Sequence, residues 1–176
     1  MAQVSYNKLG LKPDLNKVEK IQVSSETVIE VKQFLPFEKK LDVLSTIINK
    51  SVDDRGFYNS ARVQFNTDME LIFAYTNIKF TDKQLEDIMK IYDNLVVSGL
   101  GEQIYNKIPV TERNWFYNHV NVSVKNIMDY RNSVYGILDS LQTDYSNLNL
   151  DVDAIKDKLT NDTNIKDLKD IFDKTI

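Results

Sequence analysis

Apolar residues recur every three or four positions through most of the chain between residues 36 and 141. This spacing places the apolar side chains on one face of an α-helix, so it predicts helices that pack these faces together. Breaks in the spacing divide the pattern into helical segments at about 36–50, 60–75, 81–99, 102–108 and 111–141. The sequence therefore predicts a mainly α-helical fold organised as a helical bundle.

Local start and stop signals support these boundaries. Pro36 falls in the first turn of a helix, where its missing N–H costs nothing. The turn-forming run Asp53–Gly56 is expected to end this first helix. Thr81 and Gln84 have the spacing of a capping box, and Gly99 followed by Leu100 is typical of a Schellman stop.

The last of these segments predicts one long helix that Thr111 caps. Its expected inner face is heptad-like and consists of Trp115, Val120, Val124, Ile127, Val134, Leu138 and Leu141. Arg131 falls within this stripe, where an unpaired buried guanidinium would cost several kcal/mol. Arg131 is therefore either paired at a protein–protein contact, or its stem is buried while its charged end reaches solvent. The sequence leaves these two alternatives open.

A different pattern precedes the helices. β-branched residues on both sides of the polar run 24–27 predict a β-hairpin within residues 20–34. A two-stranded hairpin is marginal by itself, so it must lie on the helices or pair with strands of another chain. Residues 1–17 are polar, contain Gly10 and Pro13, and are expected to form an extended arm whose conformation depends on a partner surface.

The composition changes after residue 141. Residues 142–176 contain eight Asp, five Lys and no Glu, which gives this segment a net charge of −3. Apolar spacing predicts two short helices there, at 151–159 and 163–174, which are too short to be stable without docking. We therefore expect three parts: an N-terminal arm (1–17), a hairpin and helical bundle (18–141), and an acidic helical appendage (142–176).

Composition excludes several classes of function. With no Cys and one His, the chain has no disulfide scaffold, zinc finger, iron–sulfur cluster or thiol nucleophile. Neither glycine-rich phosphate-binding motif is present. No apolar run is long enough to span a bilayer, and residues 1–10 lack the layout of a signal peptide, so we expect synthesis in the cytosol. A pI of about 5.1 argues against nucleic-acid binding.

Candidate chemical groups each have a simple structural explanation. His119 follows Trp115 by four residues on the long helix and is expected to be packed or hydrogen-bonded rather than catalytic. The adjacent acids Asp53–Asp54 and Glu86–Asp87 point in different directions and are expected to be solvated. Asp151 with Asp153 lacks the glycine and the glutamate of a calcium loop, so helix capping accounts for it. The sequence predicts no catalytic residue, cofactor, metal or small-molecule substrate.

Clustered aromatic residues are the strongest functional signal. One helix cannot bury consecutive aromatic side chains on a single face, so a second element or another subunit must cover them. Tyr and Trp are also enriched at protein interfaces. The candidate interface residues are Phe57, Tyr58, Trp115, Phe116, Tyr117, Tyr130 and Arg131.

Four further segments carry a resemblance to known proteins. They are VKQFLPFEKKL (31–41), FAYTNIKFT (73–81), YDNLVVSGL (92–100) and YRNSVYGIL (130–138). Together they span about residues 28–141 and resemble small proteins encoded in the structural gene modules of tailed phages of low-GC Gram-positive bacteria. The resemblance implies a role in the virion or its assembly and no enzymatic activity, and it supplies no active-site residues.

The resemblance leads to one expected function with two alternatives. The expected function is a virion structural protein at the capsid, neck or tail, present in the host cytoplasm during assembly. Its expected partners are other phage structural proteins and other copies of itself, with no nucleic acid and no membrane. The first alternative is a tail assembly chaperone that does not enter the particle. The second is a small inhibitor of a host protein that acts through the acidic segment 142–176.

Overall fold

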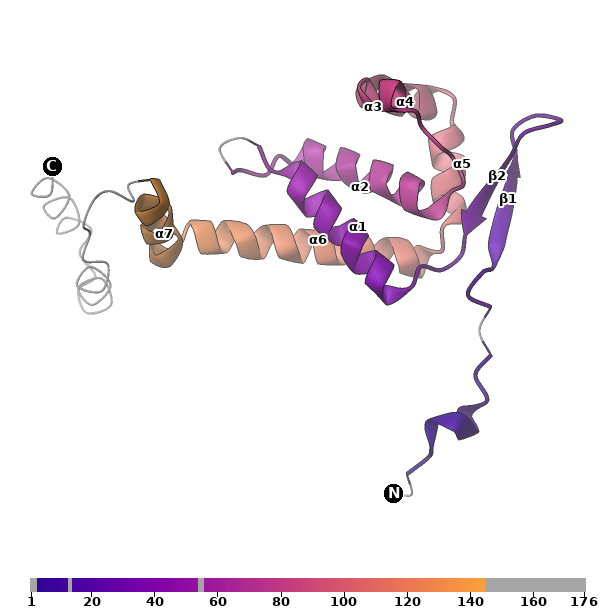
Figure 1. The fold of residues 1–176 in the computed structure, drawn as a ribbon, viewed down its shortest axis with the longest axis horizontal. Coiled ribbons are helices and arrows are strands. Elements are labelled where there is room, and N and C mark those ends of the chain that lie inside the picture. Colours follow the sequence, from indigo (N-terminus) through magenta and orange to yellow (C-terminus); the bar gives the residue numbers. More distant parts are fainter. Residues whose placement is uncertain (1–2, 13, 54–55, 145–176) are drawn as a thin grey trace, which may run out of the picture. The chain divides into compact units, whose positions relative to one another are not determined.

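The computed structural model describes residues 3–12, 14–53 and 56–144, with side chains as far as residue 140. The chain forms two compact units, 1–124 and 125–176. As predicted, the fold is mainly helical and begins with an antiparallel β-hairpin (Figure 1). The two short helices predicted at 151–159 and 163–174 lie outside the described residues. The division into an arm, a body and an acidic appendage stays a prediction.

The elements follow one another with short connections. They are η1 (Tyr6–Leu9), β1 (Val18–Gln22), β2 (Val28–Lys32), α1 (Phe37–Ser51), α2 (Ser60–Tyr75), α3 (Asp82–Leu85), α4 (Ile88–Val97), α5 (Leu100–Lys107), α6 (Val110–Arg131) and α7 (Val134–Asp144). The N-terminal arm is therefore not wholly extended, because η1 adds one 3₁₀ turn to it. The predicted bounds of the second helix, 60–75, are those of α2.

The predicted hairpin is confirmed and lies on the helices of the same chain. Ile21 pairs with Ile29 across the two strands, and both side chains are buried. The outer edge of β2 is covered by Asn77, which follows α2: its N–H donates to the Glu30 carbonyl at 3.3 Å, and its Oδ1 accepts from the Glu30 N–H at 3.0 Å. Asn77 therefore satisfies backbone groups that would otherwise form an open sheet edge.

The core of the first unit surrounds α2. Its largest completely buried side chains are Tyr75, Phe116, Ile47, Met69, Leu71, Ile104, Ile108, Val31 and Val120. The apolar spacing predicts one buried face for this helix, but Ala61 is exposed and the buried residues also include Asn66 and Thr67. The reason is that α1, α5 and α6 all pack against α2, so the helix is buried on more than one side.

The segment predicted as one helix at 81–99 is divided. The capping box is confirmed, since the Thr81 N–H donates to Gln84 Oε1 at 2.9 Å and the Gln84 N–H donates to Thr81 Oγ1 at 3.3 Å. The helix breaks at Asp87, whose φ and ψ of −115° and 47° are not helical. The apolar spacing continues across this break, which is why the sequence pattern did not reveal it.

Gly99 ends α4 and starts α5, as the predicted stop requires. Its φ of 69° and ψ of 2° lie in the left-handed region, and its N–H donates to the Val96 carbonyl at 3.0 Å. This conformation is costly for residues with a Cβ other than asparagine and aspartate. Ser98 and Gly99 are therefore enough to separate the two helices.

Replacing Gly99 with alanine is expected to lower the free energy of unfolding by about 1 kcal/mol. A Cβ at Gly99 would meet nothing within 4 Å, so the loss comes from backbone conformation and not from a clash. Gly99→Asn is the matched control, and it should lose less because asparagine tolerates the left-handed region. Urea denaturation measures both values, and an equal loss for the two variants would contradict this explanation.

The single long helix predicted from Thr111 to about Leu141 is wrong. α6 ends at Arg131, and the Ser133 N–H donates to the Tyr130 carbonyl at 2.9 Å. Ser133 Oγ then accepts the Gly136 N–H at 3.2 Å, as a capping side chain does at the start of α7. A Cβ on Gly136 would collide with the Tyr130 carbonyl oxygen, so the close turn needs glycine at this position. The predicted inner face is correspondingly incomplete, since Val134 is exposed.

Candidate functional site

The structure places the predicted interface residues in different environments. Phe57 is exposed, and Tyr58 is half-buried beside Val52, with which it forms an isolated β-bridge. Phe116 is completely buried, and its ring meets the ring of Tyr75 edge to face at 6.3 Å. Including Phe116 among the interface residues was therefore wrong, because α2 of the same chain covers it. For Phe57 and Tyr58 an interface role stays a prediction.

Two further candidates belong to the second unit. Tyr130 and Arg131 are both exposed at the end of α6. The Tyr130 hydroxyl donates a hydrogen bond to the Asp139 carboxylate, which raises the pKa of Tyr130. Arg131 does not lie in a continuous helical stripe, because α6 ends there. Its proposed place at a protein–protein contact stays a prediction.

Two aromatic candidates remain. Tyr117 lines a cavity described below. Trp115 contributes to an aromatic surface made by Phe37, Leu41, Trp115 and His119. Phe37 is 64% exposed and meets Trp115 edge to face at 6.2 Å. Leu41, one helical turn after Phe37, is also exposed. His119 stacks on Trp115 with ring centroids 4.2 Å apart, and its Nδ1 lies 2.7 Å from the Trp115 carbonyl oxygen. His119 is therefore packed and hydrogen-bonded, as the sequence predicted.

A buried ion pair lies beneath the aromatic surface and fixes its helices. Lys40 Nζ of α1 lies 2.6 Å from Glu112 Oε1 of α6, and both side chains are only 10% exposed. Glu112 Oε2 accepts the Tyr75 hydroxyl at 2.7 Å and the Leu35 N–H at 3.2 Å. Burial raises the pKa of Tyr75, so its hydroxyl stays protonated and donates. Because α1, α2 and α6 meet at this carboxylate, the ion pair positions Phe37 and Trp115.

The N-terminal arm forms a second unusual surface. Every described residue from 3 to 17 is exposed. Five large apolar side chains in this arm are each more than half exposed: Val4, Tyr6, Leu9, Leu11 and Leu15. The sequence predicts a polar arm here, although the alternation of these apolar side chains with Lys and Asn is visible in it.

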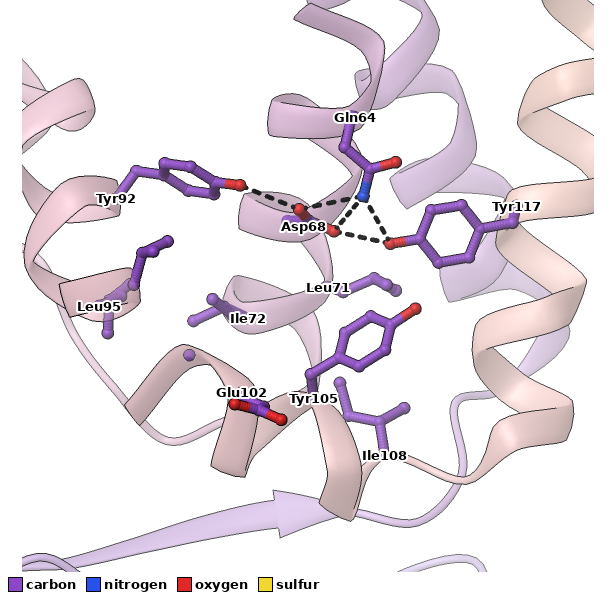
Figure 2. A pocket seen from close by; sticks show the side chains of 12 residues that line it. Gln64, Asp68, Leu71, Ile72, Tyr92, Leu95, Glu102, Tyr105, Ile108 and Tyr117 are labelled. Atoms are coloured by element: carbon purple, nitrogen blue, oxygen red, sulfur yellow. Dashed lines mark hydrogen bonds between the residues drawn. The ribbon is translucent and has the colours of Figure 1, made fainter. Parts of the chain in front are cut away.

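A cavity of about 310 Å³ lies between α2, α4, α5 and α6 (Figure 2). Apolar side chains form much of its wall, namely Leu71, Ile72, Leu95, Val96 and Ile108. Three tyrosines from three different helices complete the wall, namely Tyr92, Tyr105 and Tyr117. The cavity is thus mainly apolar with a few polar groups, which is typical of binding sites for small ligands or single side chains.

Asp68 is the polar centre of this cavity. Its carboxylate accepts the Tyr117 hydroxyl at 2.6 Å, the Tyr92 hydroxyl at 3.3 Å and the Gln64 side-chain amide at 2.9 Å (Figure 2). Burial and the Asp68 charge together raise the pKa of both Tyr92 and Tyr117, so both hydroxyls remain protonated donors. These three hydrogen bonds therefore hold the Asp68 carboxylate in position, and each of the three donors is a neutral group.

Most residues of this cavity were not predicted from the sequence. Tyr117 was named as an interface residue, but Asp68, Tyr92 and Tyr105 were not singled out. The only local signal is the four-residue spacing of Gln64 and Asp68, which join their side chains on one helix. The other groups come together only through the packing of four helices, so no spacing in the sequence could reveal them.

No group of three metal-ligating side chains occurs within the part of the chain that the structure describes. Among the described residues, no helix is both long enough and apolar enough to cross a membrane. Comparison with protein-family models, with curated proteins and with solved structures finds no match to this chain.

Proposed function

We propose that the protein is a virion structural protein of a tailed phage and acts by protein–protein assembly at the capsid, neck or tail. The observation that carries this proposal is the N-terminal arm, in which large apolar side chains are exposed along the whole described segment. The proposed partners are other structural proteins of the particle and further copies of this chain. The protein has no enzymatic role in this proposal.

Energetics support an arm that binds a partner. Burying one large aliphatic or aromatic side chain contributes about 1.5–3 kcal/mol. Five such side chains on the arm would therefore offset a large part of the cost of ordering it on a neighbouring subunit. The aromatic surface supplies a second contact region, since Phe37 and Trp115 combine large area with fixed geometry.

Replacing Val4, Leu9 and Leu11 together with serine is expected to prevent incorporation into particles while leaving the folded body intact. The three side chains are exposed and belong to no core cluster, so their loss removes partner contacts without opening a cavity. The matched control replaces Lys8 and Lys12, which lie in the same arm, with serine. Plaque counts after complementation of a phage that lacks the gene measure the effect, with thermal melting as the check on folding. Normal plaque numbers with the folded triple variant would contradict the proposed role of the arm.

A further inference from the structure

We propose that the cavity around Asp68 binds the ammonium end of an aliphatic amine. This inference is independent of the proposed assembly function and concerns a separate set of residues. The ligand chemistry is one positive charge on an apolar chain, which a free alkylamine and a lysine side chain share. Shape, polarity and charge of the cavity each support this ligand.

The shape and walls of the cavity suit a short methylene chain. Its volume of about 310 Å³ is near the lower end of the range of about 300–1,000 Å³ for small-ligand sites. Leu71, Ile72 and Leu95 are buried side chains that offer carbon surface to the chain of the amine. Figure 2 shows Leu71 and Ile72 between Asp68 and Glu102, with Leu95 to one side.

The charges of the cavity select a cation. Asp68 and Glu102 are the charged residues of its wall, and both are acidic. Within the described residues neither carboxylate forms an ion pair, and Asp68 is held only by tyrosine hydroxyls and an amide. A half-buried carboxylate without a cation attracts an ammonium group more strongly than a solvated one does. An anionic ligand would meet two carboxylates on the wall, whereas Arg113, whose guanidinium stacks on the ring of Tyr105, is not one of the lining residues.

The tyrosines add a second attraction for the same group. The hydroxyl oxygens of Tyr92 and Tyr117 lie 3.3 and 2.6 Å from the Asp68 carboxylate oxygens (Figure 2). A cation bound at Asp68 would therefore also lie close to two oxygen atoms that can accept its N–H groups.

The first test compares two ligands of equal length on the full chain by isothermal titration calorimetry. Hexylammonium is expected to bind at least about tenfold more tightly than 1-hexanol, because only the amine carries a positive charge that pairs with the Asp68 carboxylate. Equal affinity of the two ligands would overturn the proposal, since the cavity would then recognise only carbon surface. Failure of both to bind would overturn it as well.

Asp68→Asn is expected to weaken hexylammonium binding by at least about tenfold, because it removes the negative charge and keeps the shape of the side chain. Asp42→Asn is the matched control: it removes the same charge from an exposed position on α1, where Asp42 pairs with Lys39. Equal losses in the two variants would overturn the proposal by showing a long-range charge effect. If Asp68→Asn fails to fold, Glu102→Gln replaces it as the test. Glu102 is exposed at the wall of the cavity, so its substitution should leave the fold intact. Unchanged binding in folded Glu102→Gln would then overturn the proposal.

A third ligand distinguishes the two sources of the amine. Nα-acetyl-lysine methylamide carries the same ammonium group on a four-carbon chain that ends in peptide groups. Binding as tight as that of hexylammonium supports a lysine side chain of a partner protein as the occupant. Binding of hexylammonium alone supports a free amine, because the entrance then excludes a peptide backbone.

Discussion

Replacing Glu112 with leucine is expected to lower the free energy of unfolding by about 3–5 kcal/mol. The substitution leaves the Lys40 ammonium group buried without its carboxylate, which was 2.6 Å away. It also removes the acceptor for the Tyr75 hydroxyl and the Leu35 N–H, and an unpaired buried donor costs about 1–3 kcal/mol. Removing one partner of the ion pair is therefore strongly destabilising, even if the intact pair contributes little net free energy to folding.

Urea denaturation followed by circular dichroism measures this loss, and two variants serve as controls. Lys39→Met removes the exposed pair between Lys39 and Asp42 and should change stability by no more than about 1 kcal/mol. The double variant Lys40→Met with Glu112→Leu should recover part of the loss, since no charge then remains buried. A Glu112→Leu variant as stable as Lys39→Met would show that the pair is not buried as described.

Replacing Phe116 with alanine is expected to cost about 3–5 kcal/mol, because the ring is completely buried and its removal leaves a cavity. Phe57→Ala is the matched control, since the same ring is removed from an exposed position. It should change stability by no more than about 0.5 kcal/mol. The comparison separates an aromatic residue of the core from one that is available to a partner.

Thermal and urea unfolding of both variants provide the measurement for this pair. The expected order is a large loss for Phe116→Ala and almost none for Phe57→Ala. Small and equal changes would mean that Phe116 is accessible and would restore it as an interface residue. A large loss for Phe57→Ala would show that Phe57 is packed and would remove it as an interface candidate.

Helix boundaries were predictable wherever one or two residues determine them locally. The capping box at Thr81 and the left-handed Gly99 both appear as the sequence indicates. The break between α6 and α7 was not predicted, because the apolar spacing of the sequence continues through it and favours one helix. Ser133 and Gly136 carried the missed signal, since a serine cap and a required glycine start the second helix.

The candidate sites depend on contacts between residues that are distant in the sequence. Lys40 and Glu112 are 72 positions apart, and Asp68 and Tyr117 are 49 positions apart. No local pattern links such pairs, so only the packing of α2 against α6 and α1 reveals them. Phe116 was assigned to an interface because consecutive aromatics need cover on two sides. In the structure Tyr75 of α2 packs against the Phe116 ring and covers it within the same chain.

The measurement that tests the central claim most directly is quantitative mass spectrometry of purified phage particles from cells that carry the gene. The proposal of a virion structural protein predicts that this chain is present in a fixed ratio to the other structural proteins. Particles that contain none of the chain, in a strain where the gene is still required for their formation, would indicate an assembly chaperone. Complete particles that form normally without the gene would contradict any role in assembly.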